Sequence, residues 1–165
     1  VDGFLSIIQP AGSFERIAAA GGLHVAVDDS GAVVGFIVIA PPQPGQEAPS
    51  PIIERIVELA GTIEYRGRPI SSYAYALRGP VCIDARFRGH GLYGRFNTVT
   101  KAAYSDDYEI GVLFVSARNP RSLRTTTSKL SAAVVDTFQV GEESYDYLVY
   151  ELGLNLPTNR LAGGR

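Results

Sequence analysis

The stretch RFRGHGLYGRF (residues 86–96) constrains the fold most, because it carries three glycines in the spacing G-x-G-x-x-G. An extended segment (71–87) leads into it, and a segment of helical composition (93–107) follows. Glycines between a strand and a helix expose backbone N–H groups at the positive end of the helix dipole. We therefore expect an anion, such as a phosphate group, to bind at residues 89–94. The alternative is a turn that only lets strand and helix pack closely.

Two common phosphate-binding loops do not match this stretch. A dinucleotide loop needs an apolar strand that runs directly into the first glycine and an acidic residue at the end of the next strand. Here basic and aromatic residues (86–88) precede Gly89, and the far end of the next strand carries Ser116, Arg118 and Asn119. A Walker loop needs Gly-Lys-Ser/Thr, which does not follow.

The composition indicates one globular domain. The chain has 165 residues, of which 45% are hydrophobic and 19% charged, enough for a substantial core. The net charge of -2 argues against a general nucleic-acid binder. A single cysteine, Cys82, cannot form an internal disulfide, so we expect a reducing, cytoplasmic location.

The sequence shows neither a membrane-spanning run nor an N-terminal signal-peptide pattern. No apolar run reaches the ~20 residues that span a bilayer, and the N-terminus lacks a signal-peptide pattern. The printed sequence contains no methionine, not even an initiator. We therefore expect part of the N-terminus, or the methionines themselves, to be missing from it.

Hydrophobic periodicity and turn residues divide the chain into alternating helices and strands. In order, we expect a helix (12–22), a hairpin (23–40) turning at Ser30-Gly31, a proline-rich loop (41–51), a helix (52–63), the strand 71–87, a helix (93–107), a strand (110–117), a helix capped by Asn119 with Pro120 at its first position, and a hairpin (133–152). This order predicts an α+β fold with a mixed sheet.

Two strand segments have features that bear on the site. Gly79-Pro80 interrupts the strand 71–87, and central strands tolerate such a pair only with a bulge or kink. In the last strand we expect Tyr145, Tyr147 and Tyr150 to share one face. The first feature predicts a bend in the sheet next to the glycine turn.

The segment VCIDARFRGHGLYGRF (81–96) resembles motif A of the GNAT N-acetyltransferase superfamily. The resemblance aligns Ile83 with the motif valine, Phe87 with its frequent aromatic residue, and residues 88–92 with R-G-x-G-I. Tyr93 stands where a small residue is usual. A second register uses Arg86 in place of Arg88.

The resemblance extends over residues 12–154. AVVGFIVI, VLFVSARNPRSL and the closing hairpin are similar to the corresponding strands and helix of the family. It implies a mixed, mostly antiparallel sheet with a central splayed pair of parallel strands flanked by helices. The domain would then be 1–154, with an N-terminal strand missing, and 155–165 a C-terminal tail.

The family's cofactor is acetyl-CoA, which lies between the two splayed strands. By resemblance, strand backbone at Cys82 and Ile83 binds the pantetheine arm, and the amides of the glycine turn hold the pyrophosphate with Arg88. Arg121 and Arg124 either reach the nucleotide phosphates or form a solvated helix face. The cofactor-binding residues that the resemblance implies are Cys82, Ile83, Arg88, Gly89, His90, Gly91, Leu92, Tyr93, Gly94, Asn119 and Ser122.

The implied reaction is direct attack of an amine on the acetyl carbonyl, which needs a base and an acid. Relatives commonly use a tyrosine on the helix after the asparagine as acid, but this chain has RTTTSKL there. Open alternatives for the acid are Tyr73, Tyr75, Tyr104 and water, and those for the base are Glu64, Asp84, His24 and His90. The catalytic candidates are thus Glu64, Asp84 and Tyr75, all weakly indicated. Cys82 as an acyl-carrying nucleophile is less favoured than Cys82 as a small core residue.

The sequence therefore predicts an acetyl-CoA-dependent N-acetyltransferase that acts on a primary amine of a small molecule or peptide. The alternative is a catalytically degenerate GNAT domain that serves as a CoA-binding, ligand-binding or interaction module. A longer acyl donor or an oxygen acceptor is a third reading. We expect no metal, because His and Cys do not occur in ligand spacing. We expect no nucleic-acid or membrane partner, and a homodimer is compatible with the family.

Overall fold

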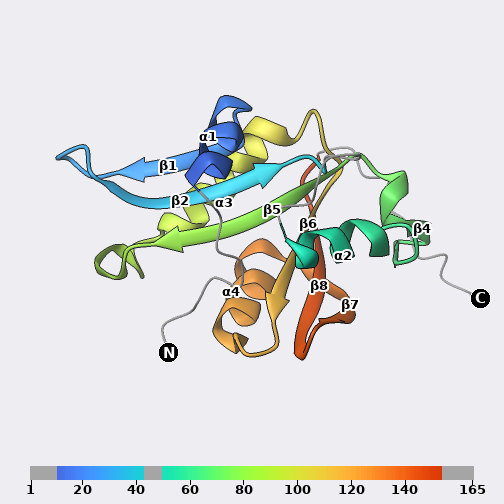
Figure 1. The fold of residues 1–165 in the computed structure, drawn as a ribbon. Helices are drawn as coiled ribbons and strands as arrows, with labels where there is room; N and C mark the ends of the chain where they lie inside the picture. The colour runs from blue at the N-terminus through green and yellow to red at the C-terminus, as the bar shows by residue number, and fades with distance from the viewer. Residues whose placement is uncertain (1–10, 43–49, 154–165) are drawn as a thin grey trace, which may run out of the picture.

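The computed structural model describes residues 11–42 and 50–153 (Figure 1). The elements in chain order are α1 (Ala11–Ala19), β1 (Leu23–Val27), β2 (Val33–Ala40), α2 (Pro51–Leu59), β3 (Glu64–Tyr65), β4 (Arg68–Pro69), the 3-10 turn η1 (Ile70–Ser72), β5 (Tyr75–Ile83), the 3-10 turn η2 (Ala85–Phe87), α3 (Leu92–Tyr104), β6 (Ile110–Ser116), α4 (Pro120–Leu130), β7 (Ala133–Val140) and β8 (Glu143–Glu151). The expected tail, the missing first strand and most of the proline-rich loop fall outside the described residues.

Six strands form one mixed sheet in the order β1-β2-β5-β6-β8-β7. Only the central pair, β5 and β6, is parallel, and every other neighbouring pair is antiparallel. The predicted α+β class and the parallel central pair are therefore confirmed. None of the described helices combines the length and apolar character needed to cross a bilayer.

The central strands separate after a short paired stretch. β5 and β6 pair only where residues 75–77 face residues 110–112. Beyond that point β5 stays on β2 as far as Ile83, and β6 stays on β8 as far as Ser116. Figure 1 shows the two strands diverging from a common end. The expected splay is thus confirmed.

A bulge in β5 lies at the point of separation. Ile37 of β2 pairs with Val81 and Ile39 pairs with Arg78, so two steps along β2 match three along β5. The extra residue falls at Gly79-Pro80, as the sequence predicts, because proline has no N–H to donate to a ladder. The bulge lies just beyond Leu77, the last β5 residue that pairs with β6.

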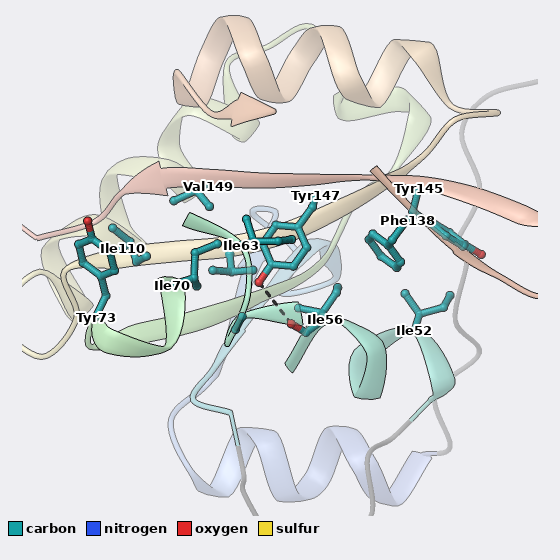
Figure 2. Close-up of a cluster of buried hydrophobic side chains, with 12 residues drawn as sticks. Ile52, Ile56, Ile63, Ile70, Tyr73, Ile110, Phe138, Tyr145, Tyr147 and Val149 are labelled. Atoms are coloured by element: carbon teal, nitrogen blue, oxygen red, sulfur yellow. Dashed lines mark hydrogen bonds between the residues drawn. The ribbon is translucent and has the colours of Figure 1, made fainter. Parts of the chain in front are cut away.

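Helices cover both faces of the sheet, and each face has its own core. On one face, α2 contributes Ile52 and Ile56 to a cluster that includes Tyr145 and Tyr147. The Tyr147 hydroxyl donates to the Ile56 carbonyl at 3.3 Å, which joins β8 to α2 (Figure 2). On the other face, Phe96 of α3 belongs to a second cluster, against which α4 also packs.

Two predicted elements differ clearly in their bounds from the structure, and one further element was not predicted. The helix 52–63 ends at Leu59, and Ile63, which the periodicity placed on the same helical face, is buried beyond the helix end. The strand 71–87 is shorter, because η1 and η2 replace its two ends. The ribbon β3–β4 was not predicted; Arg66 and Gly67 turn it with positive φ, a weak signal at this length.

Tyr150 does not share a face with Tyr145 and Tyr147, so that expectation is wrong. Side chains of a strand alternate, which puts Tyr150 in the second cluster. Its ring lies across Gly111 of β6, its cross-strand partner. A Cβ at Gly111 would lie 2.1 Å from ring atom Cε1 of Tyr150. The missing side chain is therefore what lets the ring reach towards β5.

Gly111→Ala should lower the free energy of unfolding by about 1–3 kcal/mol, because the added methyl overpacks the site of the Tyr150 ring. Urea unfolding followed by circular dichroism measures the change. Gly94→Ala is the control: nothing lies within 4 Å of a Cβ there, so stability should stay or rise by up to about 1 kcal/mol. Equal stability of Gly111→Ala and the parent would contradict this packing.

Candidate active site

The separation of β5 and β6 opens a cleft of ≈ 980 Å³. One wall is β5 from Arg78 to Ile83, and the other is β6 from Leu113 to Ser116. The glycine turn with the start of α3 borders one side, and residues of α4 border another. Within the described register, the facing edges of these two strand segments do not pair with each other. Their backbone groups are therefore available to an extended ligand.

The glycine turn presents the start of α3 to this cleft. Gly89 and Gly91 have φ of 82° and 80°, a region that favours glycine. Gly91 is the N-cap of α3, and no side chain caps the helix. The first N–H groups of a helix lack intrahelical acceptors, so those of Leu92, Tyr93 and Gly94 face outward from the helix start. This arrangement is a ready-made anion site.

Arg88 is held at the end of β5. Its Nε donates a hydrogen bond to the Ile83 carbonyl at 2.9 Å. Arg88 lines the cleft together with Ile83 and Gly89. The contact occupies the carbonyl of Ile83 and leaves the other guanidinium nitrogens of Arg88 to meet a ligand.

Asn119 begins α4 as the sequence predicts. Its Oδ1 accepts a hydrogen bond from the Ser122 N–H at 3.1 Å, and Pro120 occupies the first turn. Asn119 and Ser122 both line the cleft, as do Thr125 and Thr126 of the same helix. The cap therefore fixes the position of α4 relative to the end of β6.

The charges along the cleft are mostly positive. Its described lining contains Arg78, Arg88, Arg121 and Lys129, but Asp84 as the one carboxylate. This excess of cations contrasts with the net charge of -2 for the whole chain. A cleft of one sign concentrates oppositely charged ligands.

Asp84 is committed to a structural role. Its carboxylate accepts from the backbone N–H of Arg86 at 2.9 Å and from Nη2 of the same residue at 2.8 Å. These bonds, with the Arg86 charge, lower the pKa of Asp84 to about 2. A general base works best with a pKa near the operating pH, so Asp84 is a weak base for an ammonium substrate.

Cys82 is half-buried in the wall of the cleft. Burial raises the pKa of its thiol, and the nearby Arg88 charge acts in the opposite direction. At neutral pH the thiol is therefore protonated, which is unfavourable for a nucleophile.

The other candidates lie outside the described lining of the cleft. Glu64 is exposed on β3, and His90 is exposed at the tip of the glycine turn. Tyr75 packs against the cluster on the α2 face, where burial raises its pKa. His24 Nε2 lies 3.0 Å from the Tyr104 hydroxyl, which itself donates to the Gly21 carbonyl.

Tyr73 also serves the fold, since its hydroxyl donates to the Tyr65 carbonyl at 2.6 Å. In the described part of the chain, no three His, Cys, Asp or Glu side chains gather in a way that could hold a metal ion. Sequence reasoning missed several residues of the cleft lining, among them Arg78 and Lys129. For Arg78 the available signal was an arginine inside an otherwise apolar strand segment, YALRGP.

Comparison with solved structures identifies the fold. A GNAT superfamily phosphinothricin acetyltransferase from Sinorhizobium meliloti, solved with AcCoA, matches with a TM-score of 0.58 at 15% identity over 93% of this chain and 73% of that one. Naa20 from Chaetomium thermophilum, in complex with a bisubstrate analogue, gives 0.62 at 15% identity over 87% and 74%. The protein has the GNAT fold. The NatC complex bound to Gag peptide and CoA gives 0.57 at 12% identity over 88% and 83%.

The predicted resemblance to the GNAT fold is thereby confirmed, although no protein-family model and no curated protein matches the sequence. At these identities the similarity establishes the architecture. The chemistry of this protein has to be inferred from its own cleft.

The state of Asp84 can be tested by NMR titration of its side-chain carboxyl carbon. The lowered pKa predicts that Asp84 is still mostly ionised at pH 3, because Arg86 stabilises the charged form. The interaction stabilises the fold above the ordinary pKa of 3.8 and is lost as the pH falls through about 2. In Arg86→Gln the midpoint should rise towards 3.8. A parent midpoint already near that value would contradict the assignment.

Proposed function

We propose that this protein is an N-acyltransferase that transfers the acyl group of a CoA thioester, acetyl-CoA in the first instance, to a primary amine of a small molecule or peptide. The observation that carries the proposal is the cationic cleft between two parted parallel strands, with an uncapped helix start at its rim. Solved proteins of the same fold hold AcCoA, CoA or a bisubstrate analogue.

The glycine turn would hold the phosphates of the donor. The N–H groups at the start of α3 and the guanidinium of Arg88 supply hydrogen-bond donors and positive charge. Arg121 and Lys129 add charge along the α4 side. His90 is exposed at the same turn and would contact phosphate or solvent.

The parted strand edges would hold the pantetheine arm. The Asp84 N–H donates to the Val34 carbonyl, so in the alternating ladder with β2 the backbone of Cys82 faces β2 and that of Ile83 faces the cleft. Backbone at Ile83, on the β5 wall, can therefore bond an extended arm in the manner of an added strand. N–H groups directed at the thioester carbonyl would stabilise the oxyanion that forms when an amine attacks. The side chain of Cys82 would lie beside the arm and take no part in the transfer.

The transfer requires one proton to leave the amine and one to reach the sulfur. The amine nitrogen bonds to the acyl carbon, the carbon–sulfur bond breaks with its electron pair on sulfur, and the displaced proton goes to the thiolate or to solvent. Asp84 is held ionised by Arg86, so it does not suit the role of base. Water is then the proton carrier best compatible with the described lining of the cleft.

A second candidate is a CoA-binding domain that performs no catalysis. Two observations favour it: α4 places threonines, not a tyrosine, along the cleft, and Tyr93 lines the cleft beside the glycine turn. Binding of acetyl-CoA without acetylation of any amine in a broad panel would support this candidate over the enzyme.

Isothermal titration calorimetry with acetyl-CoA tests the donor site. The parent should bind, and Gly91→Asp should bind at least about tenfold more weakly, because a carboxylate placed at the helix start repels the phosphates. Gly91→Asn is the matched control, because an asparagine has to adopt the same left-handed backbone conformation as the aspartate but carries no charge. No binding by the folded parent would falsify the proposed donor site.

Cys82 provides an independent reporter because it is the chain's single cysteine. Its raised pKa predicts slow alkylation by iodoacetamide at neutral pH, and CoA should slow the reaction further by covering the β5 wall. Adenosine 3′,5′-bisphosphate lacks the arm and should give little protection. Equal protection by both ligands would place the arm away from β5. Mass spectrometry of the alkylated fraction measures the rates.

A further inference from the structure

A buried arginine lies at the closed end of the cleft. Arg78 is 4% exposed, lines the cleft and directly follows Leu77, the last β5 residue that pairs with β6. Its Nη2 donates to Asn97 Oδ1 at 2.7 Å. Its Nη1 is buried with no hydrogen-bond partner among the described residues. The guanidinium therefore has an unsatisfied donor.

The surroundings of Arg78 are aromatic. Its Cζ lies 5.5 Å from the ring centroid of Tyr93 and 5.7 Å from that of Tyr150. The Tyr150 hydroxyl is buried, which raises its pKa, and the Arg78 guanidinium is close enough to act against that rise. The two groups do not meet in hydrogen-bond geometry, so the hydroxyl also has no partner in the described chain. Ring faces attract a cation, but they leave the N–H group and the hydroxyl unsatisfied.

No described carboxylate forms an ion pair with Arg78. Arginine stays protonated in proteins, and a buried charge is normally paired. The Arg78 Nη1 and the Tyr150 hydroxyl are two unsatisfied donors close together, and one of them is charged, so an anionic group is the acceptor that suits them best. In this cleft the ligand has to supply it.

The phosphates at the glycine turn are too far away to be that acceptor. Arg78 Nη2 bonds Asn97, which follows Leu92, the first residue of α3, by five residues. Five residues of helix rise about 7.5 Å, well beyond hydrogen-bond reach of a phosphate at the helix start. A second anionic group is therefore needed at the closed end. A carboxylate suits the planar fork of an arginine and can also accept from a tyrosine hydroxyl.

We propose that the acyl group of the donor ends in a carboxylate, as in malonyl- or succinyl-CoA, and that Arg78 and Tyr150 bind this carboxylate. The inference rests on the proposed function, in which a CoA thioester occupies the cleft, and it specifies the acyl group. With the phosphates at the glycine turn, the thioester end points to the closed end. The Tyr93 ring lies against the guanidinium and has to turn aside for the carboxylate to reach it.

The transfer itself is unchanged by this acyl group. The amine nitrogen bonds to the thioester carbon, the carbon–sulfur bond breaks, and CoA leaves with a proton that came from the amine. The distal carboxylate stays ionised throughout and remains paired with Arg78. The product is an amide whose acyl part retains a free carboxylate.

The test compares acyl-CoA affinities by calorimetry. Succinyl-CoA should bind about tenfold or more tightly than butyryl-CoA, which has the same number of acyl carbons and no carboxylate. In Arg78→Gln this ratio should fall to near one, and Arg78→Lys should keep part of it. Tyr150→Phe, which removes only the hydroxyl, should lower the ratio. Arg55→Gln removes an exposed arginine of α2 as a charge control and should keep the parent ratio.

Each outcome separates this inference from the proposed function. Equal affinity of the parent for succinyl-CoA and butyryl-CoA, with acetyl-CoA still bound, overturns the inference alone, whether or not the Arg78 variants fold. Failure of every CoA thioester to bind overturns the proposed function as well. The CoA-saturated parent is also titrated with 4-aminobutyrate and butylamine. A preference for 4-aminobutyrate that Arg78→Gln abolishes, without a succinyl preference, assigns the carboxylate to the acceptor and overturns the donor assignment.

Discussion

The early separation of β5 from β6 is the constraint on which the rest of this structure depends. Each central strand keeps its outer antiparallel partner, so the sheet divides into two three-stranded halves that meet over residues 75–77 and 110–112. Backbone groups along the parted edges lose their sheet partners, which is costly unless solvent or a ligand replaces them. Burial of the two apolar clusters, one on each face of the sheet, stabilises the fold and offsets this cost. A fold of this kind keeps a binding cleft open through its own packing.

Positive charge lies at both ends of the cleft, but the two ends differ in the groups that supply it. The rim at the glycine turn combines a helix start with Arg88, whereas the closed end holds Arg78 between two tyrosine rings. These positive centres are separated along β5, so one ligand with anionic groups at both ends matches them better than a compact anion. The acidic balance of the chain as a whole gives no sign of this local excess. Charge placement, and not net charge, is what indicates the ligand.

Local sequence signals were reliable where a short-range rule decides the backbone. The Asn119 cap, the Gly79-Pro80 bulge and both hairpins follow from turn chemistry and period-two alternation. The errors arose where tertiary contacts decide. Periodicity alone extended the helix 52–63 past Leu59, although Ile63 is buried through a turn and not through a helix. Catalytic candidates chosen by residue type, such as Glu64, lie outside the described cleft lining, because type carries no distance information.

The sequence by itself determined the order of elements, the glycine turn before α3 and the resemblance to a GNAT fold, since these depend on residues that are neighbours in the chain. Only the tertiary structure decided the surroundings of Arg78. Tyr150 reaches it from β8 across Gly111 of β6, and Tyr93 reaches it from α3. These segments lie far apart in sequence, and their composition does not predict that they contact one another. A buried charge without a partner is a property of packing, because burial and pairing exist only once distant segments have come together.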